Sequence, residues 1–486
     1  MTQRAFAVII QKSMRSWAGN QKGRSRIRCE KCTTVSLLPN EIIGNRKMTK
    51  RKKVLFFTDR IFWPANDGHK VVLTNYCKGL VSEYDCDVHV LSFLEAGQDE
   101  QSVLSRPDFI SSVALANKPD KKTIVKNLTT ALAKGVCGGP IQCALFKSKA
   151  VAKQLRDLTV KLKPSHVFID LPRLSPYIDA ISDLPCKKVL YMEDSFSVRY
   201  QRQLNSLNTL NKTGGVAGKY TANFKGGVAK LASNSTLQKF VLGTESARMR
   251  RLEHDAPKQF DYVVLVSPVE AERLTAETGN SNIIAVPLGV DCPFYTSGPE
   301  PSPRPGVVSF LGDMRAAANA DSLRYIADEV LPLIGPDVML EVVGTASEDL
   351  IDEFKSNNQI RFLGRVEDTR AALRSTSVFL APIAYGTGIK TKILEAMAIG
   401  VPIVTNAIGN EGIGLIDCVD AFVADGATGQ AAAVRRLLDD KDLAIRLASS
   451  ARRKAIEIFD WQKSLENFSY LGFESSEDAK GDANVA

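Results

Sequence analysis

The stretch YGTGIKTKILEAMAIGVPIVTN, residues 385–406, joins a glycine-containing loop to an apolar helix and then to a buried strand. Gly400 and Pro402 end the helix, and SVFLAPI (377–383), before the loop, is a further expected strand. A strand–helix–strand unit of this kind indicates a parallel sheet covered by helices. The apolar residues of the helix, expected over 389–399, recur at helical spacing and predict one buried face: Ile389, Ile393, Ala396 and Met397.

The loop and the start of the helix form a predicted phosphate cradle. Gly386 and Gly388 let the backbone approach a ligand closely, and a helix start offers free N–H groups and a positive dipole end. Lys390 adds a positive charge, and the Glu395 carboxylate can accept two hydrogen bonds from a vicinal diol such as ribose. These features suit a sugar nucleotide. An ordinary strand-to-helix turn followed by a solvated glutamate has the same local sequence, so both interpretations stand at this point.

Short apolar strands alternate with helices on both sides of this stretch, and the alternation restarts after residue 306. Six prolines between residues 286 and 306 mark a linker. The chain is therefore expected to be α/β, with two Rossmann-like doubly wound domains facing each other across a ligand-binding cleft. The predicted parts are a basic disordered tail at 1–50, an N-terminal domain at 51–290 with a variable insertion and long surface helix at 201–260, the linker at 291–306, a C-terminal domain at 307–472 and a disordered tail at 473–486.

The positive charge of the chain is concentrated at its beginning. The whole sequence has a net charge of +9, but residues 1–53 hold fourteen Lys and Arg against two Glu. The rest of the chain is close to neutral, so general affinity for polyanions is not expected of its body. The tail fits a nucleic-acid arm, an organelle presequence, or a start of translation at Met48 that leaves residues 1–47 outside the fold.

Cysteine usage and hydropathy indicate a reducing, aqueous compartment. Nine cysteines are scattered along the chain, and their odd number does not suggest a disulfide framework. Cys29 and Cys32 form a lone CxxC motif without two further ligands at zinc spacing, so no metal site is expected. The basic tail lacks an apolar run long enough for a signal peptide or a membrane span. We expect a cytoplasmic protein.

The segment GTGIKTKILEAMA (386–398) resembles the nucleotide-sugar motif of glycosyltransferase family 4, whose enzymes have the GT-B fold. It is most similar to the bacterial exopolysaccharide and surface-polysaccharide branch of that family. Other pieces resemble the family in the same order, and together they cover roughly residues 52–470: PANDGHKVVLTNYCKGL (64–80), YMEDSFSVRY (191–200), VPLGVD (286–291) and FLGDM (310–314).

This resemblance implies a metal-independent hexosyl- or glycosyltransferase. The enzyme would move a sugar from a nucleoside-diphosphate sugar to a saccharide or lipid-linked acceptor, with retention at the anomeric carbon, in surface polysaccharide biosynthesis. The nucleotide sugar would be a co-substrate, and no cofactor is implied. Peripheral contact with the inner membrane is expected where the acceptor is lipid-linked. The N-terminal domain would hold the acceptor and the C-terminal domain the donor.

The resemblance also implies site residues. Asp194 and Glu193 would lie on the acceptor side as catalytic residues, and Gly68, Asp67 and Arg199 would line a loop that touches phosphate or acceptor. The donor would be bound by Gly312, Arg315, Tyr385, Gly386, Thr387, Gly388, Lys390 and Glu395.

The chain departs from the family pattern at three places. Thr387 stands where the first of two family glutamates is usual, and Glu193 stands in place of a histidine. The Arg/Lys pair after the first strand of the donor domain is replaced by Asp313 and by Ala318 or Asn319. Lys390, aided by Arg315, is expected to carry the phosphate charge that this pair normally handles.

Several of these residues have simpler interpretations that stay open. Gly68 also fits an ordinary strand-to-helix turn. His69 could be a ligand or a proton carrier, but it is expected to be a solvated residue at a helix start. Asp194 could cap a helix, while Arg199 could pair with phosphate or with Asp194. Tyr385 could stack on base or sugar, or be an exposed loop residue. Two further residues, Asn319 and Asp321, are expected to cap the first helix of the donor domain.

Two rival functions use the same sequence. A non-hydrolysing nucleotide-sugar epimerase would share the fold, but it needs carboxylates placed for elimination, and the motif argues against it. A nucleic-acid-binding protein would depend on the basic tail, yet the body lacks basic stretches interleaved with aromatic residues. Removal of residues 1–47, followed by assays of sugar transfer and nucleic-acid retention, separates these possibilities.

Overall fold

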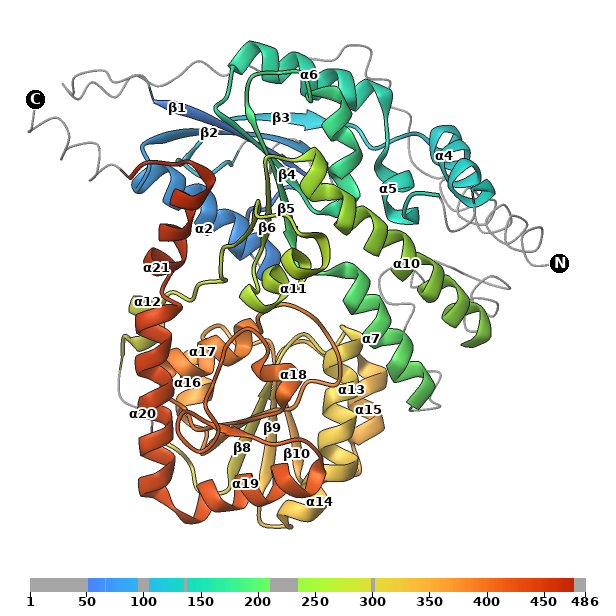
Figure 1. Cartoon of the computed structure of the whole chain (residues 1–486). Helices are drawn as coiled ribbons and strands as arrows, with labels where there is room; N and C mark the ends of the chain where they lie inside the picture. The colour runs from blue at the N-terminus through green and yellow to red at the C-terminus, as the bar shows by residue number, and fades with distance from the viewer. Residues whose placement is uncertain are drawn as a thin grey trace, which may run out of the picture.

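The computed structural model describes residues 51–65, 67–94, 105–134, 138–209, 235–298 and 302–475. The predicted tail at 1–50, residues 210–234 of the predicted insertion and residues 476–486 of the second predicted tail lie outside these ranges. Within them the chain forms two α/β halves, each built on one sheet (Figure 1).

The first half is built on a seven-stranded parallel sheet. Its spatial order is β3-β2-β1-β4-β5-β6-β7, so the direction of winding reverses between β1 and β4. Such a reversal is the switch point at which doubly wound sheets bind ligands. The strands are β1 (Lys52–Thr58), β2 (Cys86–Phe93), β3 (Ile110–Ala116), β4 (His166–Asp170), β5 (Lys187–Glu193), β6 (Tyr262–Leu265) and β7 (Ile283–Ala285).

The second half contains a six-stranded parallel sheet with the order β10-β9-β8-β11-β12-β13. Its switch point lies between β8 and β11. The predicted α/β fold with two Rossmann-like doubly wound domains is confirmed. The strands are β8 (Val307–Leu311), β9 (Met339–Val343), β10 (Ile360–Gly364), β11 (Val378–Ala381), β12 (Ile403–Thr405) and β13 (Phe422–Val423).

Helices cover both faces of each sheet (Figure 1). Those up to the linker are α2 (Gly68–Ser82), α4 (Lys121–Ala133), α5 (Ile141–Phe146), α6 (Lys149–Leu162), the 3₁₀ helix η2 (Pro172–Ala180), α7 (Phe196–Thr209), α10 (Ser235–Gln259), α11 (Pro268–Thr278) and α12 (Cys292–Thr296). Those after it are α13 (Ala317–Tyr325), the π-helical turn η3 (Ile326–Val330), α14 (Leu331–Ile334), α15 (Glu348–Phe354), α16 (Thr369–Arg374), α17 (Thr391–Ile399), α18 (Ala407–Asn410), α19 (Ala427–Asp439), α20 (Lys441–Ile458), α21 (Trp461–Glu466) and the 3₁₀ helix η4 (Asn467–Leu471).

Strand β1 shows why the sheets need two layers of helices. Its residues alternate between two apolar clusters, with Val54 and Phe56 in one and Leu55 and Phe57 in the other. Phe56 stacks on Phe168 of β4 with ring centroids 4.6 Å apart. A strand that is apolar on both faces is stable only when both faces are covered.

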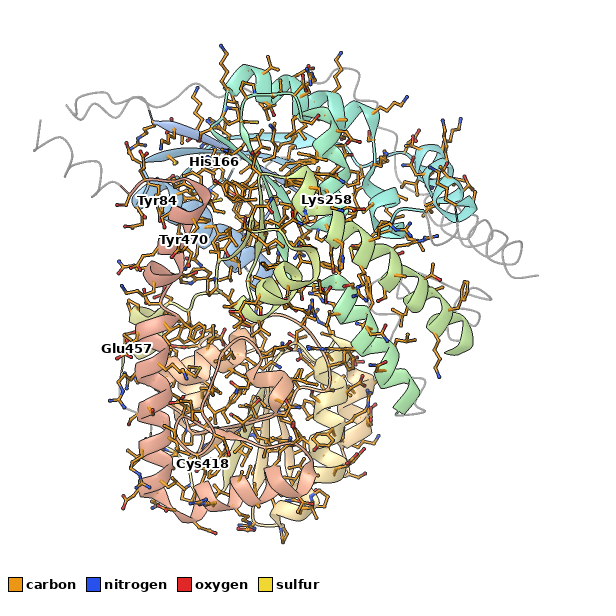
Figure 2. All side chains as sticks on the ribbon, in the orientation of Figure 1. Tyr84, His166, Lys258, Cys418, Glu457 and Tyr470 are labelled. Atoms are coloured by element: carbon orange, nitrogen blue, oxygen red, sulfur yellow. The ribbon has the colours of Figure 1, made fainter. Side chains whose placement is uncertain are left out.

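The last helices return to the first half of the molecule. The chain crosses along α20, and α21 and η4 then pack against α2 and β7 (Figure 1). The Tyr84 hydroxyl donates to the Leu465 carbonyl over 2.8 Å, and His166 Nε2 lies 2.9 Å from the Leu471 carbonyl; both side chains are labelled in Figure 2. Residues 461–473 therefore contact the N-terminal domain, although the predicted boundary at 472 assigns most of them to the C-terminal one. Phe473, placed in the predicted disordered tail, is buried.

Four further elements differ from the expectations. Strand β3 was not predicted, because its serines interrupt the apolar pattern, and strand β7 was not predicted, because it is only three residues long. Helix α12 lies inside the predicted linker at 291–306, of which residues 299–301 are not described. Helix α10 is not confined to the surface, since its own residues Met249 and Glu253 are buried.

Candidate active site

The loop that precedes α17 lies at the junction of the two halves. Gly386 and Gly388 have φ values of +149° and +69°, which favour glycine. A Cβ atom on Gly388 would lie 3.4 Å from the Asp194 Cβ atom, so the loop presses against the end of β5. Helix α17 begins at Thr391 and not at 389, because Lys390 still has extended backbone angles. Among the described residues, no side chain caps the first turn of α17.

Asp194 and Arg199 meet this loop from the first half. The Thr387 hydroxyl donates to Asp194, and the Arg199 guanidinium binds Asp194 and also donates to the Thr387 hydroxyl over 3.3 Å. Arg199 also lies over the Phe196 ring, 4.6 Å from its centroid. Of the two partners expected for Arg199, the structure places Asp194 in contact. The carboxylate that position 387 lacks is therefore present nearby, but it comes from the opposite domain.

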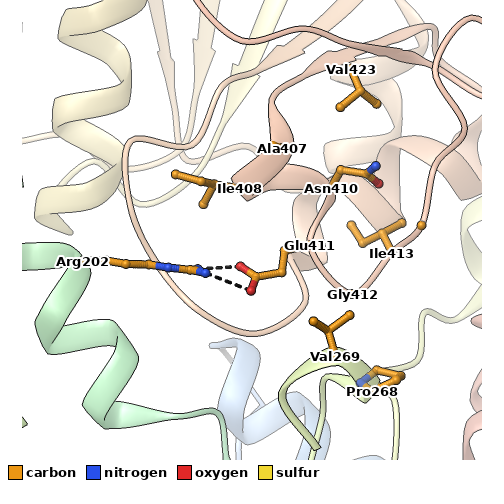
Figure 3. Close-up of a pocket in the computed structure, with 11 residues that line it drawn as sticks. Arg202, Pro268, Val269, Ala407, Ile408, Asn410, Glu411, Gly412, Ile413 and Val423 are labelled. Carbon is orange, nitrogen blue, oxygen red and sulfur yellow. Dashed lines mark hydrogen bonds and ion pairs between the residues drawn. The ribbon is translucent and has the colours of Figure 1, made fainter. Parts of the chain in front are cut away.

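A second ion pair crosses the same junction. Arg202 makes two contacts with Glu411, at 2.5 and 2.9 Å (Figure 3). It also donates to the Gly386 carbonyl. The pair borders a cavity of about 560 Å³ whose other walls include Pro268, Val269 and the segment 407–414. Sequence reasoning missed both residues. Arg202 follows Arg199 by three positions on α7, and this spacing was the available signal.

Lys390 does not extend freely into the cleft. Its ammonium donates to the carbonyls of Thr387 and Gly388, over 3.0 and 2.5 Å. Burial lowers the Lys390 pKa to about 8, partly opposed by Glu411, Asp194 and Glu270. The Lys390 ammonium thus stabilises its own loop, and the nearby carboxylates of Glu411, Asp194 and Glu270 attract it. Its predicted role on phosphate stays a prediction.

Lys392, which the sequence analysis did not select, lies at the carboxyl end of β8. Its ammonium is 2.7 Å from Asn319 Oδ1 and 4.5 Å from the centroid of the Phe310 ring. A Cβ atom on Gly312 would lie 3.1 Å from the Lys392 ammonium. Burial lowers the Lys392 pKa to about 7, opposed by the nearby charge of Glu395. Lys392 therefore occupies the region from which the usual Arg/Lys pair is missing, since Asn319 is one of the replaced positions.

Glu395 lies on the same helix, next to the linker. The Tyr295 hydroxyl of α12 hydrogen-bonds to it, and burial raises the Glu395 pKa to about 7. The ends of β8 and β9 lie close together next to this helix. A Cβ atom on Gly344, after β9, would lie 1.9 Å from the carbonyl oxygen of Gly312, after β8. Only a backbone without a side chain fits at residue 344. Glu395, Lys392 and the two glycines thus line one end of the second sheet.

Two expectations for the donor side are wrong in detail, and a third is not tested. Arg315 is exposed and binds Asp313 at 2.7 and 2.8 Å, and its predicted help to Lys390 on phosphate stays a prediction. Tyr385 is buried, and its hydroxyl donates to Asp321 over 2.9 Å, which leaves no exposed ring for stacking. Helix α13 starts at Ala317 after Ala316, so neither Asn319 nor Asp321 caps it.

On the acceptor side, Asp67 caps α2 by accepting from the Lys70 N–H over 3.1 Å. A Cβ atom on Gly68 would lie 3.9 Å from Thr391 Cγ2, so the start of α2 faces the start of α17 across the junction. The prediction that the loop at Gly68 touches phosphate or acceptor stays a prediction.

His69 is not solvated, contrary to expectation. It is 8% exposed, with Nε2 3.1 Å from Asp170 and Nδ1 3.3 Å from Glu193. Burial lowers the His69 pKa, but the two carboxylates outweigh it and raise the pKa well above its usual value. Burial likewise opposes ionisation of Glu193, whose pKa is nevertheless lowered to about 2 by His69 and by nearby arginines. Glu193 also has a φ of +68°, a strained value that often accompanies function.

Part of the sequence is similar to known glycosyltransferases. Residues 305–440 match the family model described as glycosyl transferases group 1. A phosphatidyl-myo-inositol mannosyltransferase of Mycolicibacterium smegmatis is 30% identical over 208 residues, which are 39% of this chain and 52% of that protein. A glycogen synthase of Mycobacterium tuberculosis is 27% identical over 244 residues, 46% of this chain and 56% of that protein. The chain spans about half the length of the curated relatives it matches.

Solved structures extend the likeness to both halves. HepE of Anabaena in complex with UDP aligns with a TM-score of 0.57 at 14% identity, over 86% of this chain and 98% of that one. Sucrose-phosphate synthase from Thermosynechococcus elongatus aligns with a TM-score of 0.60 at 12% identity, over 87% and 98%. Residues 305–440 thus resemble the group 1 glycosyltransferases in sequence, and the described residues have the GT-B fold.

The group 1 glycosyltransferase segment contains the whole predicted donor side. Gly312, Lys392 and Glu395 all lie within residues 305–440, as does the loop before α17. Asp194, His69 and the other acceptor-side residues lie outside it, so their roles depend on the geometry of the junction.

Proposed function

We propose that the protein is a glycosyltransferase that moves a sugar from a nucleoside-diphosphate sugar to a saccharide or lipid-linked acceptor, with retention at the anomeric carbon. The observation that carries this proposal is the meeting of the two sheets at the loop before α17. There Thr387, in the loop before the uncapped first turn of α17, contacts Asp194 and Arg199 of the other half.

The donor would lie along the carboxyl edge of the second sheet. Its diphosphate would contact the first turn of α17, where free N–H groups and the helix dipole favour an anion. The Lys392 ammonium, next to Gly312, would supply the positive charge. Glu395 would accept hydrogen bonds from the ribose, in the role the sequence predicts. Lys390 would hold the loop in shape through the carbonyls of Thr387 and Gly388.

Transfer breaks the bond between the anomeric carbon and the diphosphate, and negative charge develops on the leaving group. Fixed positive charge and oriented N–H groups stabilise that charge without rearrangement, and in many enzymes such stabilisation contributes most to the rate. Asp194, held by Arg199 and the Thr387 hydroxyl, would lie beside the sugar and stabilise positive charge at the anomeric carbon. We propose that departure of the diphosphate needs no metal ion, because these groups supply the charge.

The likeness of the motif to the surface-polysaccharide branch supports a role in building such a polysaccharide at the cytoplasmic face of a membrane. No helix among the described residues is long and apolar enough to cross a bilayer. Contact with a lipid-linked acceptor would then be peripheral.

The test is incubation of the full chain with UDP-, GDP- and related sugar donors, followed by detection of the released nucleoside diphosphate. Release of the nucleoside diphosphate supports transfer when it requires added saccharide or lipid-linked acceptor and is lost when the first turn of α17 is altered. NMR of the product then assigns the anomeric configuration. An altered sugar without any acceptor would instead indicate an epimerase. Absence of donor binding with every nucleotide sugar would contradict the proposal.

A further inference from the structure

Three chemistry-bearing side chains converge at the carboxyl edge of the first sheet, on the acceptor side of the cleft. Asp59 follows β1, Asp170 ends β4, and His69 is the second residue of α2. One ligand atom from each lies within 4.8 Å of the others, and all three residues are buried. They lie at the switch point between β1 and β4, where a doubly wound sheet binds its ligands.

A proton or a metal ion must lie between His69 Nε2 and Asp170. Nδ1 lies 3.3 Å from Glu193 and Nε2 lies 3.1 Å from Asp170, so carboxylates face both nitrogens. A neutral imidazole that donates from Nδ1 presents a lone pair at Nε2, directed at a carboxylate oxygen. Two acceptors at this separation repel each other unless a proton or a metal ion lies between them.

The oxygen atoms favour a metal ion over a proton. A proton on Nε2 satisfies one oxygen of Asp170, but the other, Oδ1, has no hydrogen-bond partner among the described residues. Asp59 Oδ1 is also without one, although Arg173 donates to Asp59 Oδ2 over 3.1 Å. Asp170 is fully buried and Asp59 is 7% exposed, so water cannot readily serve either oxygen from bulk solvent.

The charges lead to the same conclusion. Three carboxylates meet here, from Asp59, Asp170 and Glu193, and Arg173 faces them together with His69. Arg199 also lies near Glu193, but it is paired with Asp194. Arg60 lies 4.0 Å from Asp59, and it makes a closer ion pair with Asp67 at 3.2 Å. With His69 protonated, the inner cluster keeps one unbalanced negative charge, whereas a neutral imidazole and a divalent cation balance it.

We propose that Asp59, His69 and Asp170 bind one divalent transition-metal ion, through His69 Nε2 and the unpartnered carboxylate oxygens. A mixed nitrogen and oxygen set suits Zn²⁺, Mn²⁺ or Co²⁺ better than Mg²⁺ or Ca²⁺. Glu193 Oε1 lies 3.3 Å from His69 Nδ1 and would accept its proton when the ion is bound, the arrangement by which an outer carboxylate orients a metal-bound histidine. The ion therefore positions Glu193 at the cleft. It lies on the acceptor side and takes no part in holding the diphosphate.

The test uses the full chain, freed of metal with a chelator and titrated with Co²⁺, whose visible absorption reports coordination by protein ligands. We expect one equivalent to bind with a protein-ligand spectrum, and Zn²⁺ to displace it. His69→Gln and Asp170→Asn are expected to weaken binding at least about 100-fold, and Glu193→Gln about 10- to 100-fold. His89→Gln is the matched control, because His89 is a buried histidine of the same sheet that bonds Ser112 at 2.7 Å. It is expected to leave the titration unchanged.

The wild-type titration alone decides the matter if a variant fails to fold, which circular dichroism would show. A wild-type protein that binds no stoichiometric Co²⁺ or Zn²⁺, or that gives only the spectrum of the aqueous ion, would overturn the proposal. The cluster would then be held by the histidine proton. Equal binding by wild type and His69→Gln would also overturn it. Neither outcome affects the proposed transfer activity, which is measured separately with the donor.

Discussion

Replacement of Lys392 by methionine separates the two lysines of the motif. The change removes the ammonium and keeps a long apolar side chain over Phe310, where the ammonium now lies 4.5 Å from the ring centroid. A hydrogen bond to a charged partner contributes about 1.5–3 kcal/mol, so affinity for the donor diphosphate is expected to fall about 10- to 150-fold. Lys390→Met is the matched control. Its ammonium already binds two loop carbonyls, so its loss is expected to change affinity by less than about threefold.

The assay is calorimetric titration with UDP and GDP, followed by the donor KM of each variant. Lys392→Arg adds a test of protonation. Because the Lys392 pKa is lowered to about 7 by burial, the lysine is mostly neutral above pH 7 and must take up a proton when a diphosphate binds. Wild-type affinity is therefore expected to be constant below pH 7 and to fall by up to about tenfold per pH unit above it.

The arginine variant stays charged throughout this range, so its affinity is expected to lose this slope. Glu395 titrates in the same region, since burial raises its pKa to about 7, and Glu395→Gln separates its contribution. The reasoning is refuted if Lys392→Met binds nucleoside diphosphates like the wild type, or if Lys390→Met shows the larger loss. An unchanged pH slope in Lys392→Arg would refute the protonation argument alone.

Further predictions concern the junction and the C-terminal return. Arg202→Ala removes a bidentate contact to the opposite half and is expected to lower kcat/KM for the donor about 10-fold, or ~1.4 kcal/mol, in steady-state kinetics. Asp194→Asn is expected to lower kcat about 10²- to 10³-fold with little change in nucleotide affinity, because its charge acts at the transition state; equal losses in both would contradict that role. Phe468→Ala is expected to reduce the free energy of unfolding by about 3–5 kcal/mol in chemical denaturation, since its ring is fully buried against the first half. Tyr470→Ala, 66% exposed, is the control and is expected to change stability by less than about 0.5 kcal/mol.

The alternation of strands and helices could be predicted because it depends on local pattern. Strands buried on both faces appear as short apolar runs, and the two omissions, β3 and β7, are the edge strands of the first sheet and have partly exposed residues. The loop before α17 could also be placed, because Gly386 and Gly388 have backbone angles that favour glycine. The boundary at 472 could not, since nothing local to η4 reveals that Phe468 packs on Tyr76.

The site was harder to predict than the fold, because its contacts join residues far apart in the chain. The Lys392 ammonium is positioned by its hydrogen bond to Asn319, which lies 73 residues earlier in the chain. His69 appeared to be a solvated helix-start residue, and its partner Asp170 follows 101 residues later. The motif did identify the right helix. It could not show which of two lysines, separated by a single residue, is directed toward the end of β8.

The charges at the junction favour uptake of protons when the donor binds. Among the described residues, arginine and lysine side chains there are balanced by carboxylates, so a diphosphate adds uncompensated negative charge. Two of these groups have pKa values near neutrality because they are buried: the Glu270 pKa, also raised by Asp194, is raised to about 7, and the Lys392 pKa is lowered to about 7. An added anion raises the pKa of each group, so each binds more protons in the complex near pH 7 to 8. Titration of the same nucleotide in buffers of different ionisation enthalpy measures this uptake, and a binding enthalpy that is independent of the buffer would show that the diphosphate lies elsewhere.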